Sequence, residues 1–140
     1  MESKYLVWEM IKIAREHRKL VEKGISSLGI HPSQHHFLMY LSRNGPSTQN
    51  SIAEAMEVSA ATVAVSLKKL EKGNYIEKKC SPDDNRSNII ALTQKGEAVV
   101  VESKRLFEEV DTRMFQSLKE EEKEQLHSLL SQVIVAMETL

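Results

Sequence analysis

The stretch "TQNSIAEAMEVSAATVAVSLKKLEKGNYIEKKCSPDDNRSNIIALTQKG", residues 48–96, decides the fold of this 140-residue chain. It predicts two helices, over residues 48–56 and 59–73. Each begins with a hydroxyl residue, Thr48 or Ser59, which can accept a hydrogen bond from a free amide of the first turn. Two helices joined by so short a link predict a helix-turn-helix.

The second of these helices has an apolar face and a face of small side chains. Val63, Leu67 and Leu70 lie at i, i+4 and i+7, so they are predicted to face the core. The opposite face carries neither bulk nor acids over residues 60–69, and such a face can enter a major groove and reach base edges. Two alternatives stay open: an ordinary helical hairpin in an all-α core, and an Ala/Val surface for a partner helix.

A β-hairpin is predicted directly after the second helix. Two strand-like runs, residues 75–79 and 88–92, flank a turn that begins with Pro82 and carries Arg86 near its tip. Helix-turn-helix followed by hairpin is the winged-helix order, and an Arg of the wing can enter the negative potential of a narrow minor groove. Asp84 can hold Arg86 by a charge-assisted hydrogen bond. The alternatives are a pair that only braces the turn, and a surface hairpin with a solvated Arg.

Further helices are predicted on both sides, over residues 4–24, 31–45, 93–118 and 119–140. The last of them has a tight apolar stripe, and the first has an unusually wide apolar face. A terminal helix this apolar in so small a chain favours a partner. The first and last helices of two chains are therefore predicted to pair about a two-fold axis. The alternative is packing within one chain.

At this point the chain resembles the MarR family of bacterial and archaeal transcription regulators. The resemblance rests on an ordered set of motifs: "IAEAMEVSAATV", "LEKGNYIEK", the Asp84-x-Arg86 pair and "LTQKG". It implies a homodimer with a winged-helix DNA-binding lobe in each subunit, and repression relieved by a small ligand or an oxidant. Two positions depart from the family pattern. Many members carry an Arg where Val65 stands, and a second wing Arg where Asn85 stands.

Composition and charge limit the classes of function and the cellular compartments that fit this chain. The net charge is −1, which disfavours a protein that coats nucleic acid through bulk positive charge. The charge is nevertheless polarised, with +3 over residues 59–96 and −5 over residues 97–140. One unpaired thiol favours a reducing compartment, and no apolar run approaches the roughly 18 residues of a membrane span. The sequence therefore predicts a cytoplasmic protein without a membrane partner.

Other chemistry is sparse. His31 and His35 are i and i+4 and could share a metal, but surface histidines are the preferred interpretation, and neither a metal site nor a cofactor is predicted. Cys80 beside Lys79 could be a redox sensor, but redox-sensing members of the family place their cysteine near the N-terminal helices. The sequence shows no nucleophile set, phosphate loop or paired carboxylates, so no enzyme is predicted.

The prediction is thus a mainly α fold with a small β-hairpin wing, as one MarR-type domain over residues 1–140. A winged helix-turn-helix lobe spans about residues 31–96, and a helical dimerisation region spans about residues 1–30 and 97–140. The predicted function is that of a DNA-binding transcription regulator, a repressor whose homodimer binds a pseudo-palindromic operator under the control of a small apolar or aromatic effector. The alternative is a winged-helix module that binds protein rather than DNA.

Two sets of site residues follow from this interpretation. The DNA-binding residues are predicted to be Thr48, Gln49, Ser59, Ala61, Thr62, Ser66, Lys69, Lys78, Arg86 and Ser87. The ligand-binding residues are predicted to be His17, Ile13 and Met39.

Overall fold

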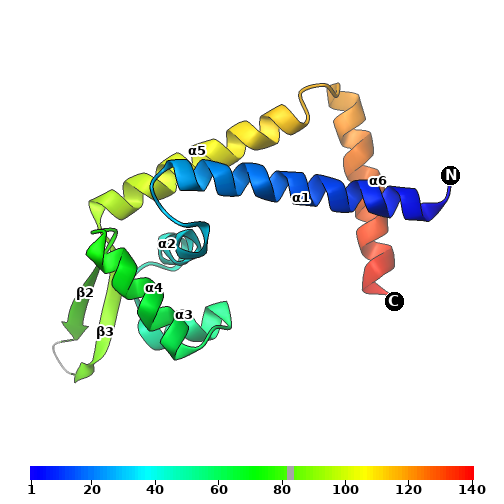
Figure 1. Ribbon diagram of the computed structural model, residues 1–140. Helices are drawn as coiled ribbons and strands as arrows, with labels where there is room; N and C mark the ends of the chain where they lie inside the picture. The colour runs from blue at the N-terminus through cyan, green and yellow to red at the C-terminus, as the bar shows by residue number, and fades with distance from the viewer. Residues whose placement is uncertain (82–83) are drawn as a thin grey trace. The chain divides into compact units, whose positions relative to one another are not determined.

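A computed structural model describes residues 1–81 and 84–140, and for residues 80–81 and 84–87 it describes the backbone alone. The chain divides into two compact units, Met1–Leu106 and Phe107–Leu140. The elements of the first unit (Figure 1) are α1 (Ser3–Ser27), α2 (Pro32–Asn44), β1 (Ser47–Thr48), α3 (Gln49–Met56), α4 (Ala60–Lys72), β2 (Ile76–Ser81), β3 (Asp84–Leu92) and most of α5 (Gln94–Met114). The second unit holds the end of α5 and α6 (Glu120–Glu138). The predicted mainly helical fold with a hairpin wing is confirmed.

Helix α1 is longer than predicted, because Gly24 lies inside it rather than at its end. A Cβ on Gly24 would collide with the side chain of Leu106, so glycine here permits the close approach of α1 and α5. Helix α2 begins at Pro32, one residue later than predicted, because His31 is its N-cap: the Nδ1 atom of His31 accepts a hydrogen bond from the Ser33 amide at 3.1 Å.

One expectation about the histidines is wrong. His35 was predicted to lie on the surface of its helix, but only 2% of its surface is exposed. It lies one turn before Leu38, which is fully buried, so it belongs to the inward face of α2. Burial lowers the pKa of His35 below its ordinary value of 6.5, and the neighbouring His36 lowers it further.

The β-structure is larger than the single predicted hairpin. Strands β2 and β3 pair antiparallel, with Ile76 opposite Leu92 and a bulge between Cys80 and Ser81. Strand β2 begins at Ile76, one residue later than predicted. The third strand, β1, pairs with the other edge of β3, so the order is β1-β3-β2. Two residues are too few to show an alternating pattern, which is why the sequence did not reveal β1.

The core lies between the helix-turn-helix and this sheet. Its fully buried apolar side chains come from α2, α3, α4 and β3 and are Leu38, Ile52, Val63, Leu67, Leu70 and Ile90. Complete burial of such a side chain contributes about 1.5–3 kcal/mol. The three α4 residues among them are those predicted to face inward, so the outward face of α4 is fixed by this packing.

Helix α5 ends at Met114, four residues earlier than predicted, and a turn follows it. The next helix begins at Glu120 because the Glu122 carboxylate accepts a hydrogen bond from the Lys119 amide at 2.8 Å, one half of a capping box. Within the second unit, none of the described α6 residues is buried. The apolar stripe of α6 is therefore not buried by the rest of its own unit.

Candidate nucleic-acid interface

Helix α3 and the turn after it set the direction of α4. The Thr48 hydroxyl accepts a hydrogen bond from the Ser51 amide at 3.1 Å, as predicted for an N-cap. At the other end of α3, Glu57 is left-handed with a φ of 54°, and the Val58 amide donates to the Ala53 carbonyl at 3.1 Å. This hydrogen-bonded turn ends α3 within one residue, so the chain enters α4 at a defined angle.

The N-terminus of α4 is held by two hydroxyl groups. The Ser59 hydroxyl accepts from the Thr62 amide at 3.1 Å and lies 2.8 Å from the Thr62 hydroxyl. Both side chains remain exposed. A hydroxyl in such a pair keeps donor or acceptor capacity, so either can still contact DNA while it caps the helix.

The outward face of α4 is small, partly apolar and basic toward its end. Ala61 and Lys69 are exposed, Ser66 is half-buried, and Val65 is 57% exposed. Lys69 and Lys72 occupy the last turn. The face therefore combines methyl groups and hydroxyls near its start with ammonium groups near its end, which suits base edges and phosphates respectively.

The structure brings most of the predicted DNA-binding residues to this region. Thr48 and Gln49 are half-buried at the start of α3, and Thr48 is engaged in capping. Lys78 is exposed on β2, which contacts α4 and starts near the C-terminal end of that helix in Figure 1. The side chains of Cys80, Asp84, Arg86 and Ser87 lie outside the described residues, so the expected Asp84–Arg86 bond and the roles of Arg86, Ser87 and Cys80 stay predictions.

Two basic residues were not included in the predicted site. Lys68 and Lys72 are exposed on α4, one turn apart, and Lys72 is beside Lys69 in the last turn. Their i, i+4 spacing is visible in the sequence and indicates a common basic edge of the helix. By contrast, Lys79 forms an ion pair with Glu77 at 3.3 Å, which reduces its availability to phosphate.

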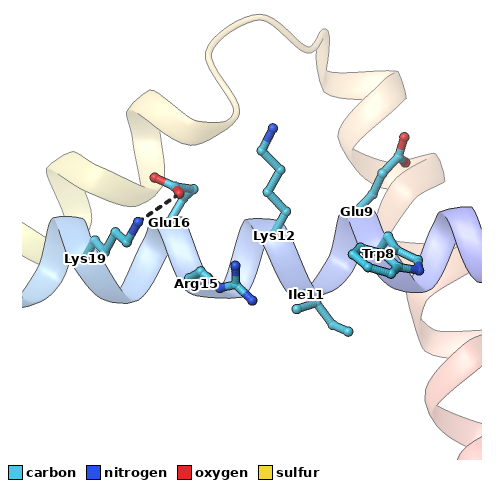
Figure 2. A pocket seen from close by; sticks show the side chains of 7 residues that line it. All are labelled: Trp8, Glu9, Ile11, Lys12, Arg15, Glu16 and Lys19. Atoms are coloured by element: carbon cyan, nitrogen blue, oxygen red, sulfur yellow. Dashed lines mark hydrogen bonds and ion pairs between the residues drawn. The ribbon is translucent and has the colours of Figure 1, made fainter.

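The predicted ligand-binding residues are spread over two helices. Ile13 is 56% exposed on α1 and His17 is half-buried one turn later. Met39 is half-buried on α2, with its Sδ 3.9 Å from the Ser103 hydroxyl of α5. A groove along α1 is lined by a different set, shown in Figure 2: Trp8, Glu9, Ile11, Lys12, Arg15, Glu16 and Lys19.

Among the residues that the structure describes, no group of three or more His, Cys, Asp and Glu side chains is placed to hold a metal ion. Over the same residues, no helix combines the length and the apolar character needed to cross a bilayer.

Comparison with known proteins decides the family. Residues 28–87 match the model of the MarR family. The chain is also 34% identical over 115 residues to the HTH-type transcriptional regulator BilQ of Clostridium symbiosum, an alignment that covers 82% of this chain and 76% of BilQ. This chain belongs to the MarR family. The family is one of transcription regulators rather than of enzymes, and this MarR-family chain is a winged-helix regulator of the DNA-binding type.

Solved structures of MarR-family regulators agree with this assignment over nearly the whole chain. MepR of Staphylococcus aureus, described as a transcription regulator of the multidrug efflux pump MepA, is 27% identical, with a TM-score of 0.87 and coverage of 98% of this chain and 99% of MepR. A MepR mutant bound to an oligodeoxyribonucleotide is 28% identical, with a TM-score of 0.79 and the same coverage.

Proposed function

We propose that this MarR-family chain is a repressor that binds a pseudo-palindromic operator as a homodimer and releases it when a small apolar or aromatic effector binds. The observation that carries the proposal is the outward face of α4, which is small near its capped start and basic near its end. A similar fold in a MepR mutant is bound to an oligodeoxyribonucleotide, which supports the same use of this face.

Helix α4 is proposed to enter the major groove with its N-terminal half against base edges. The Ala61 and Thr62 methyl groups can contact thymine methyls, and the Ser66 hydroxyl can bond a base edge. The outward face lacks an Arg, since Val65 stands where many family members carry one. Bidentate contacts to guanine should therefore be few, and the operator should be rich in A·T pairs.

Phosphate contacts are proposed for the basic residues around α4. Lys69 ends the groove-facing side of the helix, and Lys78 is exposed on the neighbouring strand. Arg86 and Ser87 are proposed to reach the flanking minor groove from the wing. The net charge over residues 59–96 is +3, so a chain with an overall net charge of −1 can still bind DNA through α4 and the wing.

The dimer is proposed to form through α1 and α6, in the helical region of residues 1–30 and 97–140. Large apolar side chains are exposed on both helices, among them Trp8 at 72%, Ile11 at 51% and Ile134 at 55%. Figure 2 shows Trp8 and Ile11 projecting from α1. Removing these surfaces from water favours association, and a two-fold axis would present two copies of α4 to successive major grooves.

The effector is proposed to bind near His17, Ile13 and Met39. Their side chains combine apolar surface with an imidazole and a thioether, and this chemistry suits a small apolar or aromatic molecule. An effector that binds the DNA-free form more tightly shifts the population away from the operator-bound form.

Selection of duplexes from a random library by the purified protein tests the proposal. The expected product is an A·T-rich pseudo-palindrome whose half-sites are one helical turn, about 10 base pairs, apart. A variant with Ala61→Glu and Thr62→Glu should select nothing, because carboxylates on the groove face repel the phosphates. Failure of the wild type to enrich any duplex, even at low salt, would favour the alternative of a protein-binding module.

A further inference from the structure

The end of α4 and the start of α5 meet in a junction of direct backbone contacts. The Thr93 amide donates to the Tyr75 carbonyl at 3.1 Å, and the Thr93 hydroxyl donates to the Asn74 carbonyl at 2.6 Å. A Cβ on Gly96 would collide with the same Tyr75 carbonyl oxygen. The first turn of α5 is therefore in contact with the backbone that leaves α4.

Lys95 adds a charged contact at this junction. Its ammonium donates a hydrogen bond to the carbonyl of Gly73 at 2.8 Å. Gly73 is the residue that caps the C-terminus of α4, and the last carbonyls of a helix have no partner within the helix and carry partial negative charge. The ammonium of Lys95 thus lies at the negative end of α4.

The same ammonium lies over an aromatic ring. It is 4.5 Å from the centroid of Tyr75, within the range of a cation–π contact. The Tyr75 ring is half-buried, and a Cβ on Gly73 would lie 2.7 Å from it, so the ring is packed against the end of α4. One side chain of α5 therefore contacts both the carbonyl of the residue that caps α4 and the aromatic ring packed against that residue.

We propose that Lys95 is a positioning residue for DNA binding, which fixes the C-terminal end of α4 to the first turn of α5 without contacting DNA. The inference rests on the proposed use of α4 as the recognition helix. It follows that Lys69 and Lys72, in the last turn of α4, are held in place against the operator by Lys95. A movement of the first turn of α5 would be passed directly to this end of α4.

The first test measures the affinity for a selected duplex at several salt concentrations. Lys95→Met should lower the affinity about 5- to 10-fold, the loss expected when a charge-assisted hydrogen bond and an exposed cation–π contact no longer hold the helix end. The salt dependence should stay as steep as in the wild type, because no phosphate contact is lost. Lys95→Arg should restore the affinity to within about twofold, since a guanidinium can make both contacts. Lys104→Met, on an exposed position of the same helix, should bind like the wild type.

Two results of this titration would overturn the inference. If Lys95→Met binds with wild-type affinity, the junction does not position α4. If Lys95→Met loses about one phosphate-equivalent of salt dependence, Lys95 contacts DNA itself.

The second test needs no DNA and keeps the inference separate from the proposed function. Hydrogen exchange of the Gly73, Tyr75 and Thr93 amides, which are bonded to Lys69, Leu70 and Tyr75 carbonyls, reports opening of the junction. Exchange at these amides should be faster in Lys95→Met than in the wild type, and normal in Lys95→Arg. Unchanged hydrogen exchange in Lys95→Met would refute the inference that Lys95 fixes the end of α4 to α5. Failure of the wild type to bind duplex would refute the proposed function alone.

Discussion

The apolar stripe of α6 gives a prediction about assembly whose size can be worked from the structure. Leu130 is 38% exposed and Ile134 is 55% exposed in the single chain. Complete burial of such a side chain contributes about 1.5–3 kcal/mol, so burying the remaining half contributes about 0.8–1.5 kcal/mol. Two positions in each of two protomers then contribute about 3–6 kcal/mol to the dimer.

Replacing both residues by Asp should remove this contribution and place carboxylates in the interface. Because about 1.4 kcal/mol corresponds to a tenfold change in an equilibrium constant, the dissociation constant of the dimer should rise by about 10²–10⁴. Sedimentation at micromolar concentration should show a dimer for the wild type and a monomer for Leu130→Asp with Ile134→Asp.

The matched control carries the same change in charge on the other side of the helix. Ser128 and Gln132 are exposed, and each lies two positions from Leu130, so both point away from the stripe. Ser128→Asp with Gln132→Asp should remain a dimer. A wild-type protein that sediments as a monomer, or a Leu130/Ile134 variant that stays dimeric, would refute the proposed interface.

Three further predictions concern the wing, the thiol and the buried histidine. If Arg86 enters the minor groove, Arg86→Ala should weaken operator binding by about 1–3 kcal/mol and reduce the salt slope by about one phosphate-equivalent, whereas Asp84→Ala should weaken binding by less. If Asp84→Ala instead weakens binding as much as Arg86→Ala or more, with unchanged salt slopes, the Asp84–Arg86 pair only braces the turn of the wing. Cys80→Ser should leave both operator binding and its response to peroxide unchanged, and peroxide release of the wild type but not of the serine variant would contradict this. The pKa of His35 is lowered by burial and then by His36, so between that pKa and 6.5 the folded protein binds fewer protons than the unfolded chain. The free energy of unfolding in urea should therefore be larger at pH 7.5 than at pH 5.5, and His35→Gln should flatten this dependence; an equal pH dependence in both proteins would contradict it.

The sequence predicts the helix-turn-helix well because its determinants are local. Thr48 and Ser59 are N-caps in the structure, and Val63, Leu67 and Leu70 are fully buried at the spacing that predicted it. Each of these features depends on residues within one or two turns of one another, so one sequence suffices to recognise them.

Features that depend on contacts between residues far apart in the sequence were harder to predict. Strand β1 exists because Ser47 and Thr48 pair with β3, more than 40 positions later in the chain. Gly24 resembles a helix terminator, but its role depends on Leu106, which no local pattern connects to it. His35 did have a local signal, since Leu38 lies at i+3 from it, but its polar neighbours concealed the stripe. The contacts of Lys95 with Gly73 and Tyr75 also join residues that are about 20 positions apart.

The candidate site was predictable only in part for a physical reason. The packing of α4 determines which side chains face outward, and the spacing of its apolar residues predicted this packing. Which outward side chains touch DNA depends on the shape of the operator and on the distance between two copies of α4 in a dimer. Neither of these is a property of one chain.

Whether the chain binds duplex DNA through α4 and the wing is tested most directly by the salt dependence of the affinity of the wild-type protein for a selected duplex. A dimer that makes about six phosphate contacts should lose about 10³ in affinity between 50 mM and 200 mM salt. Fluorescence anisotropy of a labelled duplex at four or five salt concentrations gives this slope. A steep linear decrease on a logarithmic plot is the predicted result, and no measurable affinity for any duplex at 50 mM salt would contradict it.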